Sequence, residues 1–372
     1  MTGDPRRTGP VGLALVGCGT ISDQYLTTLS TCPDVRVLWC TDIDTQRARE
    51  QAQRHGVSQS GQVSDALADS AVELVVNLTI PAAHVSVANE ALVAGKHVYG
   101  EKPLTLDRTE GRQLLQRADE AGLRIGSAPD TFLGAGLQSA QRVVTDGGIG
   151  QPVSALVCFQ SPGPESWHPN PDFLFARGGG PVLDIGPYYL TALVQQLGSI
   201  ARVASLARRP SDRRMIGSGP RAGQSFPVEV PTTVTALAEF AGGPVATLVM
   251  SFDSPQPRTG FLELTGTDAT LRLPDPNTFG GPLRIFQRGA GELAELPVSG
   301  TTKTRGIGVV EMARALRAGV PHRASGELAM HVFDAMAAIA ESAEKGAFVD
   351  LETSCQAPDP LPADWDPTAT TL

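Results

Sequence analysis

The amino-acid sequence predicts an α/β protein with two domains, and two observations support this fold class. Between residues 11 and 128, short runs with buried-strand character alternate with helical segments, which is typical of a parallel sheet with right-handed crossovers. Between residues 153 and 287, strand-like runs instead follow one another across turn residues, as in an antiparallel meander. The chain has 372 residues, which is enough for two hydrophobic cores.

The first domain begins with a strand, a glycine turn and a helix. VGLALV (11–16) is a buried-strand run, and GCGTIS (17–22) opens a helix that ends at Cys32-Pro33 because proline lacks a backbone N–H. VRVLWCT (35–41) is the second strand. The further elements expected in this domain are helices at 44–55, 82–94 and 107–121 and strands at 73–79, 97–100 and 124–128.

The glycine turn carries the first functional signal. Gly17 permits a tight turn, and Gly19 lets the backbone approach a pyrophosphate resting on the helix N-terminus at Thr20 and Ile21. Ser22 replaces the third glycine of G-x-G-x-x-G, so the motif is incomplete. The order of strand, turn, helix and second strand nevertheless predicts a Rossmann dinucleotide-binding domain.

Asp42 follows the second strand. A carboxylate there can accept hydrogen bonds from a ribose diol and would repel a 2′-phosphate, which favours NAD over NADP. A plain turn aspartate is the alternative interpretation, and the nearby Arg47 leaves NADP open.

AGKHVYGEKPLT (94–105) predicts a helix end, a short strand, and a charged pair followed by a proline. Pro103 fixes its own φ, so the chain turns there. Glu101 and Lys102 therefore lie at the carboxyl end of a strand, the edge at which open α/β sheets bind ligands.

Three motifs occur in order along the chain: GCGTIS (17–22), TIPAAH…ALVAGKHVYGEKP (79–103) and GGGPVLDIGPYY (178–189). Together they resemble the Gfo/Idh/MocA family of NAD(P)-dependent sugar and polyol oxidoreductases, over residues 11 to about 351. The resemblance implies a Rossmann NAD-binding domain (1–130) and an α+β domain for substrate binding and oligomerisation (131–355) with a large, open, mostly antiparallel sheet. The Pro- and Asp-containing tail (356–372) is expected to be extended or poorly ordered.

The sequence beyond residue 130 agrees with such a second domain. A helix is expected at 135–146, and two more at 307–319 and 326–345. The strand-like runs between them are at 153–160, 233–240, 245–253, 261–266, 270–273 and 283–287.

The resemblance places Lys102 beside the nicotinamide and in contact with the hydroxyl group that is oxidised. It also implies a cis peptide bond before Pro103. An ammonium near the nicotinamide would have a lowered pKa, and it could donate to the substrate oxygen or help to move a proton. Cofactor contacts are further expected for Thr79, Pro81, His84 and Glu101. A structural role for His84 is an equally good interpretation.

Asp184 and Tyr188 are four residues apart, so a continuous helix would present both on one face. The family most often has Asp-x-x-x-His here, with the histidine accepting the proton, and this chain departs from that pattern at Tyr188. A phenol needs a nearby cation to act as a base near neutrality, and Lys102 and the oxidised nicotinamide are the candidates. The alternative interpretation of Tyr188 is a tyrosine at the rim of the core; Tyr189 is expected to pack.

Further predictions concern the loops. Trp167 and His168 lie in a proline-rich loop, where they offer a stacking face and a polar contact for a sugar ring. Asp130 has either a substrate contact or a simple turn role. Arg213 and Arg214 lie in a polar segment and are expected to be solvated.

Composition narrows the class of partner. The formal net charge is −9 and no dense Lys/Arg run occurs, which argues against nucleic acid or an anionic membrane. Apolar runs have strand length, too short for a membrane span. The five cysteines are scattered without metal-ligand spacing, which predicts no metal site and a reduced, cytoplasmic setting. With nucleic acid and membranes disfavoured, a small-molecule substrate is the expected partner.

Three functions compete. The leading one is an NAD-dependent dehydrogenase that transfers a hydride from a secondary hydroxyl of a sugar, cyclitol or glycoside to nicotinamide C4, with Lys102, Tyr188 and Asp184 handling the proton. The second is redox-neutral glycoside cleavage by transient oxidation, elimination, hydration and re-reduction. The third is a non-catalytic protein that senses a sugar or NAD. The resemblance also implies a homodimer or homotetramer formed through the open sheet face.

Overall fold

The structure is a computed structural model that describes residues 8–256 and 259–372. The chain divides into two compact units. The first unit comprises the chain up to residue 134 together with 300–330 and 361–372, and the second comprises 135–299 and 331–360. Two segments from late in the sequence therefore belong to the first unit.

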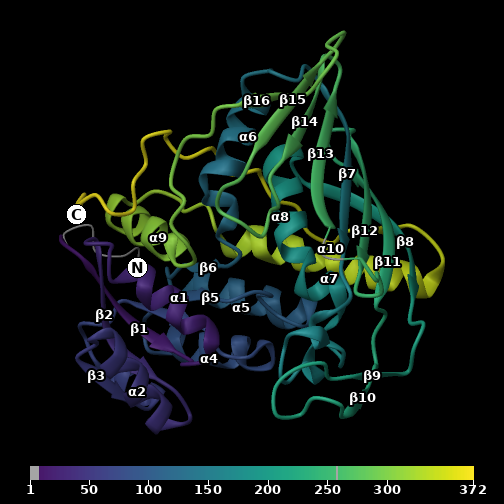
Figure 1. The fold of residues 1–372 in the computed structure, drawn as a ribbon. Helices are drawn as coiled ribbons and strands as arrows, with labels where there is room; N and C mark the ends of the chain where they lie inside the picture. The colour runs from purple at the N-terminus through teal and green to yellow at the C-terminus, as the bar shows by residue number, and fades with distance from the viewer. Residues whose placement is uncertain (1–7, 257–258) are drawn as a thin grey trace. The chain divides into compact units, whose positions relative to one another are not determined.

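The first unit is built on a six-stranded parallel sheet in the order β3-β2-β1-β4-β5-β6 (Figure 1). Its strands are β1 (Val11–Val16), β2 (Val35–Thr41), β3 (Gln59–Gly61), β4 (Leu74–Asn77), β5 (His97–Gly100) and β6 (Ile125–Ser127). Its helices are α1 (Thr20–Leu29), α2 (Thr45–His55), α3 (Val63–Ala68), α4 (His84–Val93), α5 (Arg108–Glu120) and α9 (Ile307–Ala318), with 3₁₀ turns η1 (Pro81–Ala83) and η2 (Thr131–Leu133). Strands β1 and β4 are buried along their whole length, as expected for central strands covered on both faces.

Local sequence explains where the helices of this unit begin. Asp44 caps α2 by accepting the N–H groups of Gln46 and Arg47. Asp107 caps α5 in the same way. Each cap satisfies N–H donors that have no partner within the helix. The order of the elements confirms the strand–helix alternation predicted from the sequence.

The second unit contains a nine-stranded sheet in the order β16-β15-β14-β13-β7-β12-β11-β8-β17. Its strands are β7 (Pro152–Gln160), β8 (Ile200–Arg208), β11 (Thr233–Phe240), β12 (Val245–Ser251), β13 (Thr259–Gly266), β14 (Ala269–Leu273), β15 (Leu283–Gln287), β16 (Ala294–Leu296) and β17 (Val349–Asp350). Among the strand pairs in the described part of the chain, β7–β12 is the parallel one in this sheet, so the predicted large, mostly antiparallel sheet is confirmed. A separate hairpin pairs β9 (Arg213–Met215) with β10 (Ser225–Pro227).

The helices of the second unit pack on one face of this sheet (Figure 1). They are α6 (Ala135–Thr145), α7 (Gly180–Asp184), α8 (Gly186–Leu197) and most of α10 (Gly326–Lys345), with 3₁₀ turns η3 (Pro164–Ser166) and η4 (Asp172–Leu174). Two hydrogen bonds join α10 to β8, since Ser205 Oγ donates to the Ile339 carbonyl and Ser205 N to Ser342 Oγ.

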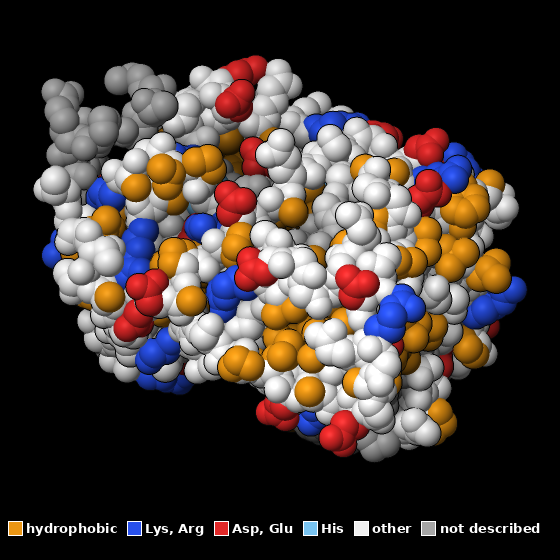
Figure 2. All heavy atoms as spheres, turned by 90° about the horizontal axis from the view of Figure 1, so that it is seen from above, with side chains coloured by type: hydrophobic (Ala, Val, Ile, Leu, Met, Phe, Trp, Pro, Cys, Tyr) orange, Lys and Arg blue, Asp and Glu red, His pale blue; other side chains and the backbone are white. Residues whose placement is uncertain are grey.

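The other sheet face carries apolar side chains that remain exposed. Leu156, Leu206 and Leu237 are 41 %, 64 % and 50 % exposed. Hydrophobic side chains gather in the right half of Figure 2, the side on which β8, β11 and β12 lie in Figure 1. We call the face of the nine-stranded sheet that carries Leu156, Leu206 and Leu237 the open sheet face.

The C-terminal residues form an extended strap on the first unit. Asp34, whose side chain is fully buried, accepts the backbone N–H of Thr371 at 2.9 Å and the guanidinium of Arg314 at 2.7 Å. Arg314 also donates to the carbonyl of Ala369 at 2.7 Å. The strap therefore joins α9 to the start of β2.

No helix in the described part of the chain is both long and apolar enough to cross a membrane. Within residues 8–256 and 259–372, His, Cys, Asp and Glu side chains form no group of three that could hold a metal ion. All five cysteines are free thiols.

Candidate active site

The glycine turn has the geometry that the sequence predicts. Gly17 has φ +95°, and a Cβ on it would lie 2.7 Å from the Leu78 carbonyl oxygen, so only glycine fits. Gly19 is the N-cap of α1, which no side chain caps, and a Cβ on it would meet nothing within 4 Å. The N-terminus of α1, at Thr20 and Ile21, is therefore open in front of Gly19.

Ser22 explains why the third glycine is dispensable. Its side chain is fully buried, and its hydroxyl donates to the Gly19 carbonyl at 2.6 Å. Ser22 Oγ also accepts Gln51 Nε2 from α2 at 2.9 Å. The serine thus packs inside the unit and stays clear of the turn that would hold a pyrophosphate.

Asp42 braces the same turn from the end of β2. It is 7 % exposed; Oδ2 accepts the Cys18 N–H at 2.8 Å and Oδ1 accepts the Asp44 N–H at 2.9 Å. Each carboxylate oxygen can accept a further bond. Arg47 lies 3.7 Å from Asp42 and 3.4 Å from Asp44, so its charge is already offset by two carboxylates.

His84, the first residue of α4, bridges the segment after β4 and the segment after β5. Its Nδ1 lies 2.7 Å from the Pro103 carbonyl oxygen and its Nε2 lies 3.0 Å from that of Thr79. The Thr79 hydroxyl donates to Asn77 Oδ1 at 2.7 Å, and Pro81 follows as the first residue of η1. Both imidazole nitrogens thus contact backbone oxygens, which favours the structural interpretation of His84 over a cofactor contact.

A tyrosine of α1, the helix that follows the glycine turn, orients the side chain of Glu101. Its Oε1 accepts the hydroxyl of Tyr25, a fully buried residue of α1, at 2.9 Å. Its Oε2 accepts the N–H of Lys102 at 2.9 Å, and its own N–H donates to the Asn77 carbonyl at 2.8 Å. The Lys102–Pro103 peptide is cis, as the resemblance implied. Lys102 is half-buried at this edge of the sheet.

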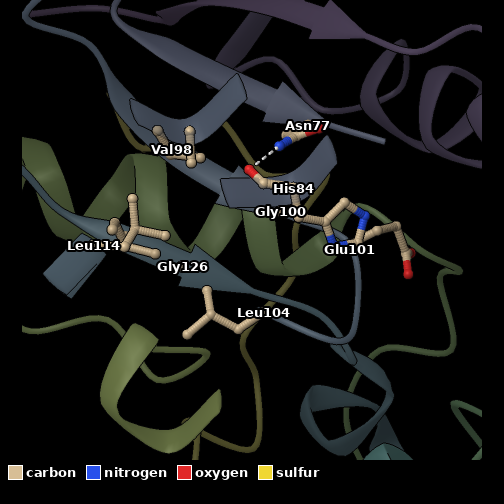
Figure 3. A pocket seen from close by; sticks show the side chains of 10 residues that line it. Asn77, His84, Val98, Gly100, Glu101, Leu104, Leu114 and Gly126 are labelled. Atoms are coloured by element: carbon tan, nitrogen blue, oxygen red, sulfur yellow. Dashed lines mark hydrogen bonds between the residues drawn. The ribbon is translucent and has the colours of Figure 1, made fainter. Parts of the chain in front are cut away.

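A small cavity lies behind Glu101 (Figure 3). Its volume is about 10 Å³, which leaves room for about one water molecule. In Figure 3 the Asn77 amide reaches the backbone oxygen of His84, a 3.0 Å hydrogen bond that closes one side. At this volume the cavity has no room for a substrate.

Asp130 has a structural role that the sequence left open. Its Oδ2 accepts the N–H groups of Gly306 and Gly308 at 2.8 and 3.1 Å, at the start of α9. Burial raises the pKa of the Asp130 carboxyl to about 6, against the opposing effect of these two N–H groups. Asp130 therefore holds α9 on the sheet.

We expect Asp130 to make the fold less stable as pH rises from about 4 to about 6. Its folded-state pKa lies above the ordinary 3.8, so the folded protein holds the proton more tightly than the unfolded chain. The full effect is about 3 kcal/mol. Asp130→Asn should flatten the unfolding free energy against pH in this window, measured by urea denaturation, while Asp107→Asn at an exposed cap should not. An unchanged slope in Asp130→Asn would contradict this assignment.

In the second unit, Asp184 and Tyr188 do not lie on one continuous helix. Helix α7 ends at Asp184 and α8 begins at Gly186. The Tyr188 N–H donates to the Ile185 carbonyl at 3.1 Å, three residues back, because Pro187 disrupts the regular pattern. The single-helix prediction was wrong. Asp184 is half-buried and Tyr188 is 6 % exposed.

The residues on either side of this pair have packing roles. Gly179 approaches the chain closely, since a Cβ on it would lie 2.5 Å from the Leu174 backbone. Tyr189 is fully buried, and its hydroxyl donates to Asp275 at 3.2 Å. The packing role predicted for Tyr189 is confirmed.

Trp167 and His168 form part of an aromatic row on the loop at 160–177. The Trp167 ring is 68 % exposed and lies edge-on to His168, with centroids 5.5 Å apart. The Phe173 ring also lies edge-on to His168, with centroids 5.5 Å apart. The row offers an aromatic surface next to an imidazole.

The sequence analysis missed one contact, made by Tyr25, and mispredicted the environment of Arg214. No local pattern indicates that Tyr25 binds Glu101, 76 residues away. Arg214 is not solvated: its side chain is 14 % exposed and forms ion pairs with Glu165 and Asp253. Arg213, by contrast, is exposed as expected and donates to Ser225.

The residues of the first unit fit a dinucleotide. The open backbone at Gly19, the uncapped start of α1 and the acceptor oxygens of Asp42 match the needs of a pyrophosphate and a ribose. Lys102 belongs to this unit, whereas Asp184, Tyr188, Trp167 and His168 belong to the second.

Comparison with known proteins agrees with this description. Residues 11–128 match the family model described as "Oxidoreductase family, NAD-binding Rossmann fold", and residues 137–272 match the "GFO/IDH/MocA C-terminal domain". These two models of one family together span more than half of the chain.

Individual relatives give the same result. A trans-1,2-dihydrobenzene-1,2-diol dehydrogenase from Bos taurus is 24 % identical over 309 residues, covering 82 % of this chain and 86 % of the relative. A 1,5-anhydro-D-fructose reductase from Ensifer adhaerens is 27 % identical over 183 residues, covering 46 % of this chain and 52 % of the relative. The solved structure of a levoglucosan dehydrogenase in its apo form superposes with TM-score 0.81 at 18 % identity, covering 94 % of this chain and 100 % of that chain. The chain therefore belongs to the Gfo/Idh/MocA family of oxidoreductases and carries that family's NAD-binding Rossmann domain.

Proposed function

We propose that this protein oxidises a secondary hydroxyl group of a sugar, a cyclitol or a glycoside with NAD as the acceptor. The observation that carries the proposal is the orientation of Glu101-Lys102-Pro103 at the end of β5. Tyr25 and the Asn77 carbonyl hold Glu101, so the backbone of Lys102 is held at the sheet edge that also carries the glycine turn. Relatives named as a dihydrodiol dehydrogenase and an anhydrofructose reductase support chemistry at a C–OH group.

In the proposed mechanism, NAD when bound supplies a hydride acceptor at nicotinamide C4. Lys102 donates a hydrogen bond to the substrate oxygen and lowers the cost of its developing negative charge. Tyr188, in the phenolate form that the positive charge of Lys102 would favour, accepts the hydroxyl proton and becomes a neutral phenol, and Asp184 orients it. Trp167 and His168 contribute a stacking face and a polar contact for the sugar ring.

NAD is proposed over NADP because of the charges around Asp42. A 2′-phosphate would approach a carboxylate whose oxygens already accept backbone N–H groups. Arg47, the nearby cation, is shared between Asp42 and Asp44. A ribose diol needs only the remaining acceptor capacity of Asp42.

The test is a panel of sugars, inositols and glycosides with NAD and NADP in parallel. We expect NADH to form with at least one polyhydroxylated substrate, and NAD to be preferred. Cleaved glycoside without NADH accumulation would instead show redox-neutral chemistry. Tight NAD binding without turnover on the whole panel would show a sensing protein.

We further propose that the protein is a cytoplasmic homodimer or homotetramer assembled through the open sheet face. Exposed Leu206 and Leu237 on neighbouring strands favour burial against a second copy. Ion pairs such as Arg202–Glu239 on the same strands provide a polar rim. A monomer in light scattering at micromolar concentration would refute this assembly.

A further inference from the structure

Arg214, on β9 of the second unit, contacts several acceptors at once. Its guanidinium forms ion pairs with the carboxylates of Glu165 and Asp253. It also donates to the backbone carbonyls of Pro162 at 3.1 Å and Phe252 at 3.0 Å. Four acceptors from two distant segments thus meet one planar group.

The planar fork of arginine explains how one side chain joins both segments. Nη1 donates to the Pro162 carbonyl and the Glu165 carboxylate in the loop at 160–177. Nη2 donates to Phe252 and Asp253, which follow β12. The guanidinium also lies 5.2 Å from the ring centroid of Phe175. A lysine would keep the charge but would lack the fork.

Other contacts join the same loop to the segment at 208–230. Arg221 binds Asp172 through two nitrogens at 2.7 and 2.8 Å. The Gly217 N–H donates to the Glu165 carbonyl at 2.8 Å. The loop that carries Trp167 is therefore bonded to the segment at 208–230 at several points.

Glu165 depends on Arg214. Its second oxygen, Oε2, is buried without a hydrogen-bond partner in the described part of the chain, so Arg214 is the side chain that compensates this carboxylate. Removing the guanidinium would leave Glu165 and Asp253 without their shared counter-charge, and the loop would have to rearrange.

We infer that Arg214 is a positioning residue for substrate specificity, which sets the placement of Trp167 and His168 without touching the substrate. The inference rests on the proposed function, in which the loop at 160–177 lines the substrate pocket. According to this inference, the β9–β10 hairpin controls how the aromatic row of Trp167, His168 and Phe173 is placed against a sugar ring.

The test compares Arg214→Met with Arg213→Met in the full-length protein. Arg213 is the matched control, because it is the neighbouring arginine on β9 but is exposed and bonded to Ser225. In Arg214→Met, KM for the best panel substrate should rise about tenfold or more, while kcat changes less than about threefold. The NAD dissociation constant, measured by calorimetry, should stay unchanged, and Arg213→Met should behave as wild type.

Hydrogen exchange provides a readout that needs no turnover. Amides at 160–177 should exchange faster in Arg214→Met and unchanged in Arg213→Met. A wild-type KM, or wild-type exchange in this loop, would overturn the inference, and so would equal loss of kcat and NAD binding. If Arg214→Met does not fold, Arg214→Lys should show the same changes at smaller size, and wild-type behaviour of that variant would overturn it. Failure of the proposed function is separate, because it appears as no turnover by the wild type.

Discussion

Replacing Lys102 with alanine is expected to slow substrate oxidation about 10²–10⁴-fold, the range typical of a lost proton-transfer or oxyanion-stabilising group. Lys102 lies just beyond the end of β5, where Glu101 accepts its backbone N–H at 2.9 Å. Stopped-flow absorbance of NADH in a single turnover, with enzyme in excess, measures the chemical step without product release.

Lys96→Ala is the control for this experiment. The Lys96 ammonium donates to the carbonyls of Asp69 and Val72 at 2.8 Å each, so its loss should lower thermal stability and leave the rate unchanged. A Lys102→Ala rate within a few-fold of wild type would show that Lys102 takes no part in the chemistry.

Replacing Tyr188 with phenylalanine removes one oxygen from a nearly buried side chain. If Tyr188 accepts the substrate proton, kcat should fall about 10²–10³-fold with little change in KM. Steady-state kinetics with saturating NAD and varied substrate measures kcat and KM separately.

Tyr189→Phe is the matched control. It removes the same atom from the adjacent residue, whose hydroxyl binds Asp275 at 3.2 Å, and should cost about 1 kcal/mol of stability without lowering kcat. If Tyr188→Phe instead keeps the wild-type kcat, another group takes the proton, and Asp184 is the next to test.

Periodicity and turn chemistry predicted much of this molecule because they act over a few residues. The β1 run is apolar at every position and is buried on both faces, and Gly17 adopts the positive φ that a tight turn requires. The break between α7 and α8 is also local. Pro187 marks it in the sequence, and the single-helix interpretation overlooked that signal.

Contacts between distant residues could not be predicted in the same way. The segment RRPSDRRM (208–215) has the composition of a solvated loop, yet Arg214 meets Glu165 and Asp253, 49 and 39 residues away. Strand β8 was missed because only two of its nine residues, Ile200 and Val203, are β-branched and none is aromatic. In both cases the partner decides the environment, and a single sequence does not name the partner.

The two late segments of the first unit have a consequence for how the chain reaches its native state. Asp130 receives an N–H from a residue 176 positions later, and Asp34 receives one from a residue 337 positions later. Contacts of such sequence separation form slowly, because a long loop must close first. During synthesis, the six strands therefore emerge before α9, which packs on β6 and α1, can cover them. A fragment ending at Gly134 would leave that flank bare, so a transplant of the dinucleotide domain into another protein must carry 300–330 and 361–372 with it.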